Sequence, residues 1–287
     1  MKRQVLLFNI FTAAMFTLPA FASEDGITGV QWGRNTYNFE SMPSGPQPIK
    51  NLNSRVLVGD FNNPNLTPEA AAALKKRGEL ALAGGFPSAE DQCRPIAPPF
   101  FSAVQFDMQI LQSKNGDLTI LGHQDDQVRH VRMNGTHPAK VVPTAMGDSI
   151  GHWEGDTLVV DTVGVRTDEF IASDRIGTPQ SELMHVVERY RLIDGTRAKA
   201  DMDAYEKAAG VIGGRPPGGY LNRDLNLKGM RLEVTMEDPK VFKQPLTGVL
   251  TFRPMTVGWR EAVCAENPVQ HYEGEWVGLP KAERPDF

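Results

Sequence analysis

The chain has 287 residues, 40% of them hydrophobic, which is enough for one large domain or two modest ones with a real core. Its formal net charge is −5 and it contains no run of basic residues. This charge argues against a nucleic acid as partner, because proteins that bind polyanions concentrate lysine and arginine on a surface.

Residues Met1 to Ala22 have the pattern of a signal peptide. Lys2 and Arg3 give a positive start, an apolar run follows, and Ala20-Phe21-Ala22 fits a cleavage site. The alternative is a membrane anchor, but the apolar run is shorter than the roughly 20 residues that a spanning helix needs. We therefore expect a periplasmic or secreted protein with no membrane span in its mature part.

Residues 23–101 read as a loop-rich and helical segment that packs on the core. Asn, Pro, Gly and Ser dominate from Ile27 to Leu66, which predicts loops with one or two strands. A helix follows, because Thr67 can cap it, Pro68 suits its first position and Gly84-Gly85 ends it.

The two cysteines, Cys93 and Cys264, both lie in the exported part. In an oxidising compartment this pair predicts one disulfide, closing a loop of about 170 residues. The alternatives are two reduced buried thiols or a catalytic thiol. Neither cysteine has a C-x-x-C partner or a histidine beside it in sequence.

Residues 102–287 form the predicted β domain. Hydrophobic residues alternate with period two, and glycine-containing turn signals separate the apolar runs at Asn115-Gly116, Asn134-Gly135, Glu154-Gly155-Asp156 and Asp194-Gly195. Residues 203–229 read as an inserted helix and loop, and the segment RAKADM before them as a strand. We expect a mainly β fold: an antiparallel meander of about eight to ten strands that closes into a barrel or folds into a sandwich, because closure removes exposed edges.

Strand parity identifies one candidate acid or base in the run ELMHVVERYRLI. Glu188 and Tyr190 lie on its more apolar face, whereas His185 and Arg189 lie on the opposite face. Because desolvation tunes a carboxylate for proton transfer near neutral pH, Glu188 is a candidate general acid or base. The alternative is an ion pair with an arginine of a neighbouring strand.

Asp161 is a charged residue inside the apolar run TLVVDTVGV, which predicts a strand buried on both faces. A carboxylate in such a strand needs a donor or a cation, and the nearest candidates in strand order are Arg132, Arg189 and His185. We favour a site on the face that carries His185 and Arg189, in which Asp161 orients His185.

Further candidates lie near the turns. His137 and His152 are candidate catalytic residues, because function gathers on loops that a rigid sheet positions. Trp153 is either an aromatic wall for a ligand or a plug in the core, and Tyr190 and Arg132 are candidate substrate-binding residues. The histidine spacings do not place two on one short element. We expect no metal and no cofactor, although a metal site assembled across strands is an alternative.

Several segments resemble a family of uncharacterised exported bacterial proteins with a G-x-W-E-G-D-T-L-V-V-D-T signature. They are LTPEAAAAL, Cys93-Arg94-Pro95, QDDQVRHVRMNGTHP, MGDSIGHWEGDTLVVDTVG and SELMHVVERYRLID, in that order between Thr67 and Asp194. The resemblance implies an exported β-rich protein and assigns no catalytic residue. The chain departs from the family pattern at Asn134-Gly135-Thr136 and at Gln180.

These patterns favour an exported, cofactor-independent enzyme of the lyase or isomerase type. It would perform acid–base chemistry on a small, largely apolar organic molecule in a barrel cavity. The alternatives are a non-catalytic binding protein for a lipid-like or aromatic ligand, and a structural exported domain.

Overall fold

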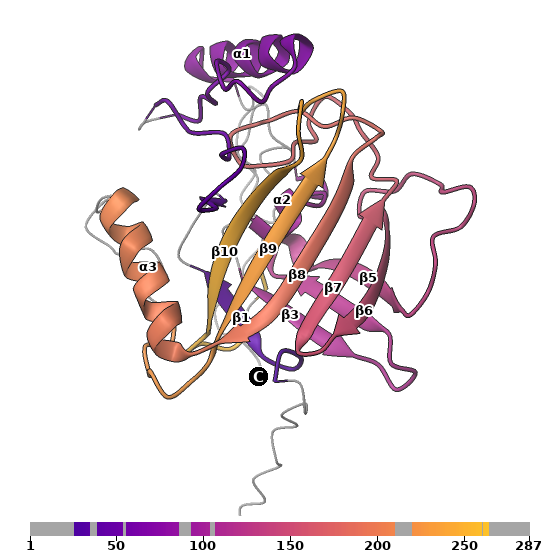
Figure 1. Ribbon diagram of the computed structural model, residues 1–287, viewed down its shortest axis with the longest axis vertical. Helices are drawn as coiled ribbons and strands as arrows, with labels where there is room; N and C mark the ends of the chain where they lie inside the picture. The colour runs from indigo at the N-terminus through magenta and orange to yellow at the C-terminus, as the bar shows by residue number, and fades with distance from the viewer. Residues whose placement is uncertain are drawn as a thin grey trace, which may run out of the picture.

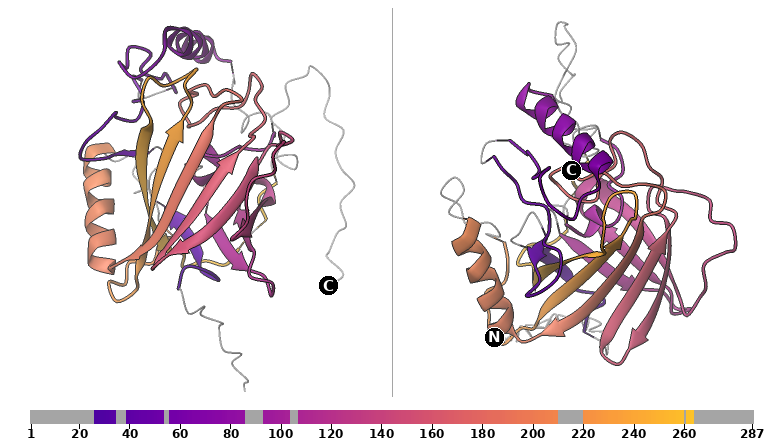
Figure 2. Two further views of the ribbon diagram at one scale, coloured as in Figure 1. Left: turned by 45° about the vertical axis from the view of Figure 1, so that its right-hand side comes forward. Right: turned by 45° about the horizontal axis from the view of Figure 1, so that its top comes forward.

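The computed structural model describes residues 26–34, 39–53, 56–85, 93–103, 107–209, 220–259 and 261–263. Nine strands close into a β-barrel to which a tenth strand is attached, so the predicted mainly β barrel is confirmed (Figures 1 and 2). The strands are β1 (Gln31–Arg34), β2 (Glu40–Ser41), β3 (Met108–Gln112), β4 (Leu118–Gly122), β5 (Gln127–Met133), β6 (Asp148–Glu154), β7 (Thr157–Val163), β8 (His185–Ile193), β9 (Gly229–Glu237) and β10 (Leu246–Pro254).

The N-terminal strand β1 closes the barrel. Trp32 lies opposite Met108 of β3 on one side and Pro254 of β10 on the other. The short strand β2 pairs with β10 further along, where Ser41 lies opposite Gly248. Closure gives every long strand two neighbours, which leaves no long edge open to pairing with another chain.

The barrel is mixed rather than wholly antiparallel, because β5 and β6 run parallel. The turn signal at Asn134-Gly135 predicted a hairpin, and this expectation is wrong. Asn134 adopts a positive φ of 56°, but residues 134–147 then return along the barrel before β6 begins. A parallel pair needs such a longer return, since a two-residue turn can join only antiparallel strands.

Helix α1 (Pro68–Leu82) confirms the predicted helix and its start. The Thr67 side chain accepts a hydrogen bond from the Ala70 N–H at 3.2 Å, and Pro68 occupies the first turn. The helix lies across one end of the barrel (Figure 1). It is held there because the Thr67 N–H donates to the Val241 carbonyl in the β9–β10 connection.

Three further helical elements follow α1 in the described part of the chain. They are α2 (Phe100–Ala103), the 3₁₀ turn η2 (Gln124–Asp126) and α3 (Gly195–Ala209). Helix α3 corrects the strand expected at RAKADM after the Asp194-Gly195 signal. Its side chains pair at helical spacing, Arg197 with Asp201 and Lys199 with Asp203, which supports a helix along the outside of β9 and β10 (Figure 1). No helix in the described part of the chain has the length and apolar character that crossing a membrane requires.

The barrel interior is packed with side chains. Its inward faces carry apolar residues in one continuous core, including Ile110, Leu158, Val186, Leu232 and Phe252. The burial of the barrel strands thus follows the period-two alternation of the sequence.

Helix α3 and β2 bring two carboxylates together, which predicts a pH-dependent stability. Burial, followed by the nearby charge of Asp201, raises the pKa of Glu40 from 4.5 to about 7, although Arg231 opposes this. The folded protein therefore keeps a proton that the unfolded chain releases between these two values. The free energy of unfolding should fall as the pH rises through this window.

Glu40→Gln should remove most of this slope, because the amide stays neutral at every pH. We expect the variant to match the wild type at pH 4 and to be more stable by about 1–2 kcal/mol at pH 8. Urea unfolding at both pH values measures this, with the exposed Glu79→Gln as control. Parallel pH profiles of wild type and Glu40→Gln would contradict the assignment.

Candidate functional site

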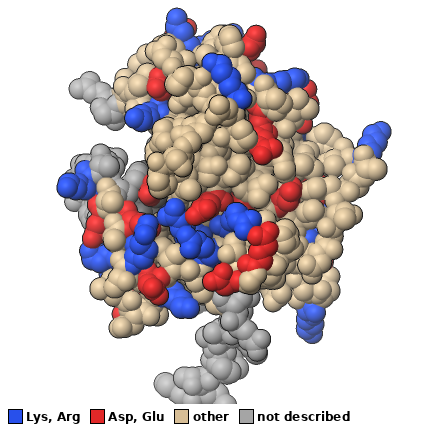
Figure 3. Space-filling view, viewed as in Figure 1, with Lys and Arg blue, Asp and Glu red and all other residues tan. Residues whose placement is uncertain are grey.

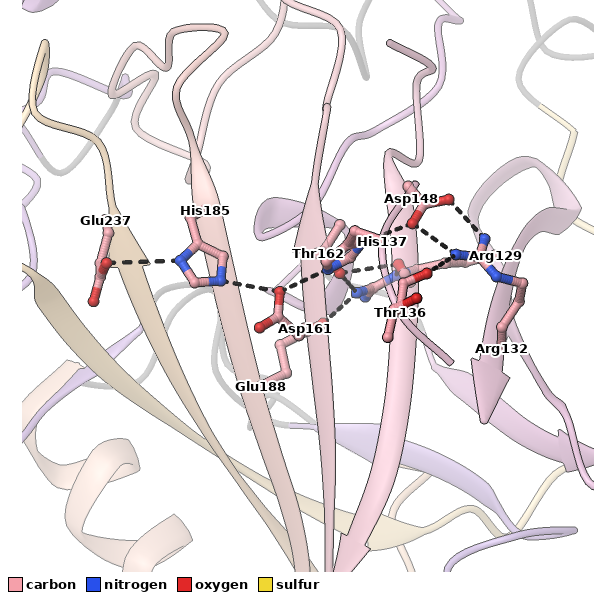
Figure 4. A network of polar contacts seen from close by, with 11 residues as sticks. Arg129, Arg132, Thr136, His137, Asp148, Asp161, Thr162, His185, Glu188 and Glu237 are labelled. Atoms are coloured by element: carbon pink, nitrogen blue, oxygen red, sulfur yellow. Dashed lines mark hydrogen bonds and ion pairs between the residues drawn. The ribbon is translucent and has the colours of Figure 1, made fainter. Parts of the chain in front are cut away.

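A row of charged and imidazole side chains crosses the outer face of four adjacent strands (Figure 4). Asp148 begins β6, Asp161 lies near the end of β7, His185 begins β8 and Glu237 ends β9. Because β6 and β8 run opposite to β7 and β9, these four positions meet at one end of the barrel. His137, from the β5–β6 connection, lies between Asp148 and Asp161.

Asp161 is the centre of this row. Its Oδ1 lies 2.9 Å from Nε2 of His185 and 3.1 Å from Nε2 of His137. The sequence left open what pairs with this carboxylate. The structure places Asp161 and His185 together, as we expected, and adds His137, whereas Arg132 and Arg189 contact other acids.

The two histidines are engaged differently. His137 has both ring nitrogens hydrogen-bonded, since its Nδ1 lies 2.7 Å from Asp148 Oδ1. His185 has Nε2 on Asp161, but its Nδ1 is 3.6 Å from Glu237 Oε2, too far for a good hydrogen bond, and its side chain is 35% exposed. A tautomer that donates from Nε2 to Asp161 leaves Nδ1 of His185 without a proton, on the side of the ring that faces Glu237.

Asp148 and Arg132 form the other end of the row. Arg132 donates to both carboxylate oxygens of Asp148, at 2.6 and 3.0 Å. The hydrogen bond from Arg132, followed by the one from His137, holds the pKa of Asp148 below its usual range. This bidentate contact keeps Asp148 ionised and fixes His137 against Asp161. We predicted Arg132 as a substrate-binding residue, but its guanidinium is already hydrogen-bonded to Asp148.

Glu188 lies inside the barrel, away from the row. Its Oε2 is 2.5 Å from Nη2 of Arg129 on β5, and both side chains are 0% exposed. Its Oε1 accepts hydrogen bonds from Ser102 of α2 at 2.5 Å and from Tyr190 at 2.9 Å. The ion-pair alternative holds for Glu188, but the arginine reaches it across the interior rather than from a neighbouring strand.

Arg129 and Tyr190 belong to the same buried cluster as Glu188. Burial would lower the pKa of Arg129, but the interactions with Glu188 and Tyr190 together more than offset it, so the pKa lies above its usual value. Burial is the first cause that raises the pKa of Tyr190, which keeps its hydroxyl protonated. Arg129 also donates to Ser149 and Thr162. These contacts pair most of the buried polar atoms with one another, and Nη1 of Arg129 is left without a hydrogen-bond partner among the described residues. The cluster has the features of a structural core.

His152, Arg189 and Trp153 also lie outside the row. His152 is 3.1 Å from Glu154, which also pairs with Arg189, and all three side chains are at least 40% exposed. Figure 3 shows acidic and basic side chains gathered over the lower parts of β8 and β9. Trp153 packs partly buried against the core cluster, which favours the core-plug interpretation.

Two further predictions concern the disulfide and a metal site. Cys264 lies outside the described residues, so its pairing with Cys93 stays a prediction. No group of three or more His, Cys, Asp or Glu side chains within the described ranges is arranged to hold a metal ion. The row in Figure 4 is a chain of hydrogen bonds and ion pairs instead.

Sequence reasoning missed Asp148, Glu237 and Arg129. Asp148 shares a strand face with Ile150 and His152, and this alternation could have placed it beside Asp161 once β6 and β7 were paired. Arg129 and Arg132 lie on opposite faces of β5, so composition alone could not decide which arginine points inward.

Comparison of the chain with protein-family models, with curated proteins and with solved structures found no match. The resemblance to exported bacterial proteins therefore stays a prediction.

Proposed function

We propose that this protein is an acid–base enzyme of the lyase or isomerase type, with His185 as the proton-transferring group and Asp161 as the residue that orients it. The observation that carries the proposal is the 2.9 Å contact between Asp161 Oδ1 and His185 Nε2, with Nδ1 of His185 beside Glu237 at 3.6 Å and not hydrogen-bonded to it. An imidazole oriented by a carboxylate in this way is a common general base.

The supporting residues fit this role. His137 holds the same oxygen of Asp161 from the other side and is itself held by Asp148, so the carboxylate has little freedom to turn away from His185. Glu237, half-exposed and 3.6 Å from Nδ1 of His185, is placed to exchange a proton with solvent. Such prior ordering reduces the reorganisation that proton transfer requires.

The reaction that we propose begins when Nδ1 of His185 takes a proton from a carbon of the substrate. The electron pair of the broken C–H bond then forms a double bond. In a lyase reaction a leaving group departs with its bonding electrons. In an isomerisation the new double bond replaces an existing one, whose π electrons move to the next atom, and that atom takes the proton back from the imidazolium of His185. Both routes balance without an oxidant or a cofactor.

The experiment incubates the purified protein with an organic-solvent extract of the organism that makes it, followed by mass spectrometry of the mixture. The Asp161→Ala/His185→Ala double variant is the blank. Conversion of a compound by the wild type alone is the expected result. Retention without conversion would favour the binding-protein alternative, and no difference between the two proteins would overturn the proposal.

Export and the disulfide belong to the same proposal. The leader-like residues 1–22 support a periplasmic or secreted location, and an oxidising compartment would allow Cys93 and Cys264 to pair. The intact mass of alkylated protein, with and without reductant, tests the pairing: uptake of alkylating agent without reductant would exclude it.

A further inference from the structure

A second site lies at the α1 end of the barrel, independent of the row around Asp161. A cavity of about 250 Å³ opens between α1, the segment before α2 and the β7–β8 connection. Its deeper lining belongs to the core, since Ile96, Phe100 and Ile176 are all nearly inaccessible to solvent. The cavity therefore reaches from the surface into apolar material.

The charged groups at this cavity already have partners. Arg77 of α1 donates to the backbone carbonyls of Phe170 at 3.1 Å and Glu169 at 3.2 Å. Asp174 accepts from the backbone N–H of Thr178 at 3.0 Å and from its hydroxyl at 2.6 Å. A ligand's charge would have to compete with these bonds, whereas its apolar surface would meet hydrocarbon.

The same contacts make the cavity preformed. Arg77 fastens α1 to the β7–β8 connection, and it passes so close to Gly177 that a Cβ there would lie 2.4 Å from its Cδ. Gly177 also has a φ of +86°, which favours glycine. The Arg94 guanidinium lies 4.1 Å from the centre of the Phe170 ring, which belongs to the same connection, and holds it in place. A wall held from two sides needs little reordering when a ligand enters.

We infer that this cavity binds a small, uncharged, apolar molecule, such as an aromatic hydrocarbon of roughly ten or more carbon atoms. The size follows from the volume, because apolar cavities of about 150 Å³ hold benzene. The aromatic preference follows from the rings of Phe100 and Phe170 in the lining.

Two fluorescent probes with the same ring framework test the inference: neutral N-phenyl-1-naphthylamine and anionic 8-anilino-1-naphthalenesulfonate. Titration of the full-length protein should show saturable binding of the neutral probe, at least about tenfold tighter than binding of the anion. Equal or tighter binding of the anion would show that the arginines recognise charge and would overturn the proposed ligand class. No saturable binding of the neutral probe would overturn the site.

A matched pair of substitutions on α1 locates the binding. Ala81 lines the cavity, whereas Ala73 is exposed on the same helix. Ala81→Trp should weaken binding of the neutral probe at least about tenfold, and Ala73→Trp should change it less than about twofold. If Ala81→Trp does not fold, Ala81→Leu should give a smaller loss in the same direction. Unchanged binding in a folded Ala81 variant would contradict the site. Neither variant touches Asp161 or His185, so this test can fail independently of the proposed enzyme.

Discussion

Replacing Arg129 with methionine should lower the free energy of unfolding by about 3–5 kcal/mol. The substitution removes the cation that lies 2.5 Å from Glu188 inside the barrel and leaves that carboxylate without its charge partner. Because neither side chain is exposed, water cannot solvate the unpaired Glu188 carboxylate unless the core opens. Urea denaturation followed by circular dichroism measures the loss.

The double variant Arg129→Met/Glu188→Leu distinguishes the pair from its parts. Removing both charges eliminates the uncompensated carboxylate, so the double variant should recover most of the stability that Arg129→Met loses. Arg189→Gln breaks the exposed pair with Glu154 and is the control, with an expected change of at most about 1 kcal/mol. If Arg129→Met were as mild as Arg189→Gln, the buried pair would not have the structural role described above.

Asp161→Asn should reduce kcat/KM of the conversion by about 10²–10⁴-fold while the protein stays folded. The amide keeps the shape of the side chain, but its NH₂ group can donate to Nε2 of His185 and so favour the tautomer that carries the proton on Nδ1. Nδ1 would then carry a proton and could not act as the base. Steady-state kinetics on the compound identified in the extract measures the effect.

Glu154→Gln is the matched control for Asp161→Asn. Glu154 also contacts a histidine, His152, on the same sheet, but it lies at the opposite end of β6 from Asp148. Its replacement should change kcat/KM less than about twofold. Equal losses in the two variants would show that the effect is a general response of the sheet and not a property of the row.

Local sequence signals predicted an element correctly where a single residue determines the backbone conformation. Thr67 and Pro68 placed the start of α1, and Glu154-Gly155-Asp156 placed the tight turn between β6 and β7, where Gly155 adopts a φ of +62°. They failed where longer-range packing decides. Gly195 reads as a hairpin turn but begins α3, because the chain that follows packs as a helix on the outside of β9 and β10.

The candidate site was only partly predictable for the same reason. Alternation along β8 correctly separated His185 from Glu188, because strand parity depends on local sequence alone. It could not show that Arg189, roughly 13 Å along the strand from His185, pairs with Glu154 instead. Nor could it find Arg129 of β5, which reaches Glu188 of β8 past the two intervening strands β6 and β7; that contact depends on the order and curvature of the sheet.

Proton transfer by His185 is tested by comparing the turnover of the identified compound by two histidine variants. His185→Gln and His152→Gln remove the same chemical group from β8 and β6, which lie on either side of β7, on the same outer face. We expect His185→Gln to lower kcat at least about 100-fold and His152→Gln to leave it within about twofold of the wild type. Turnover by folded His185→Gln at the wild-type rate would contradict this role of His185.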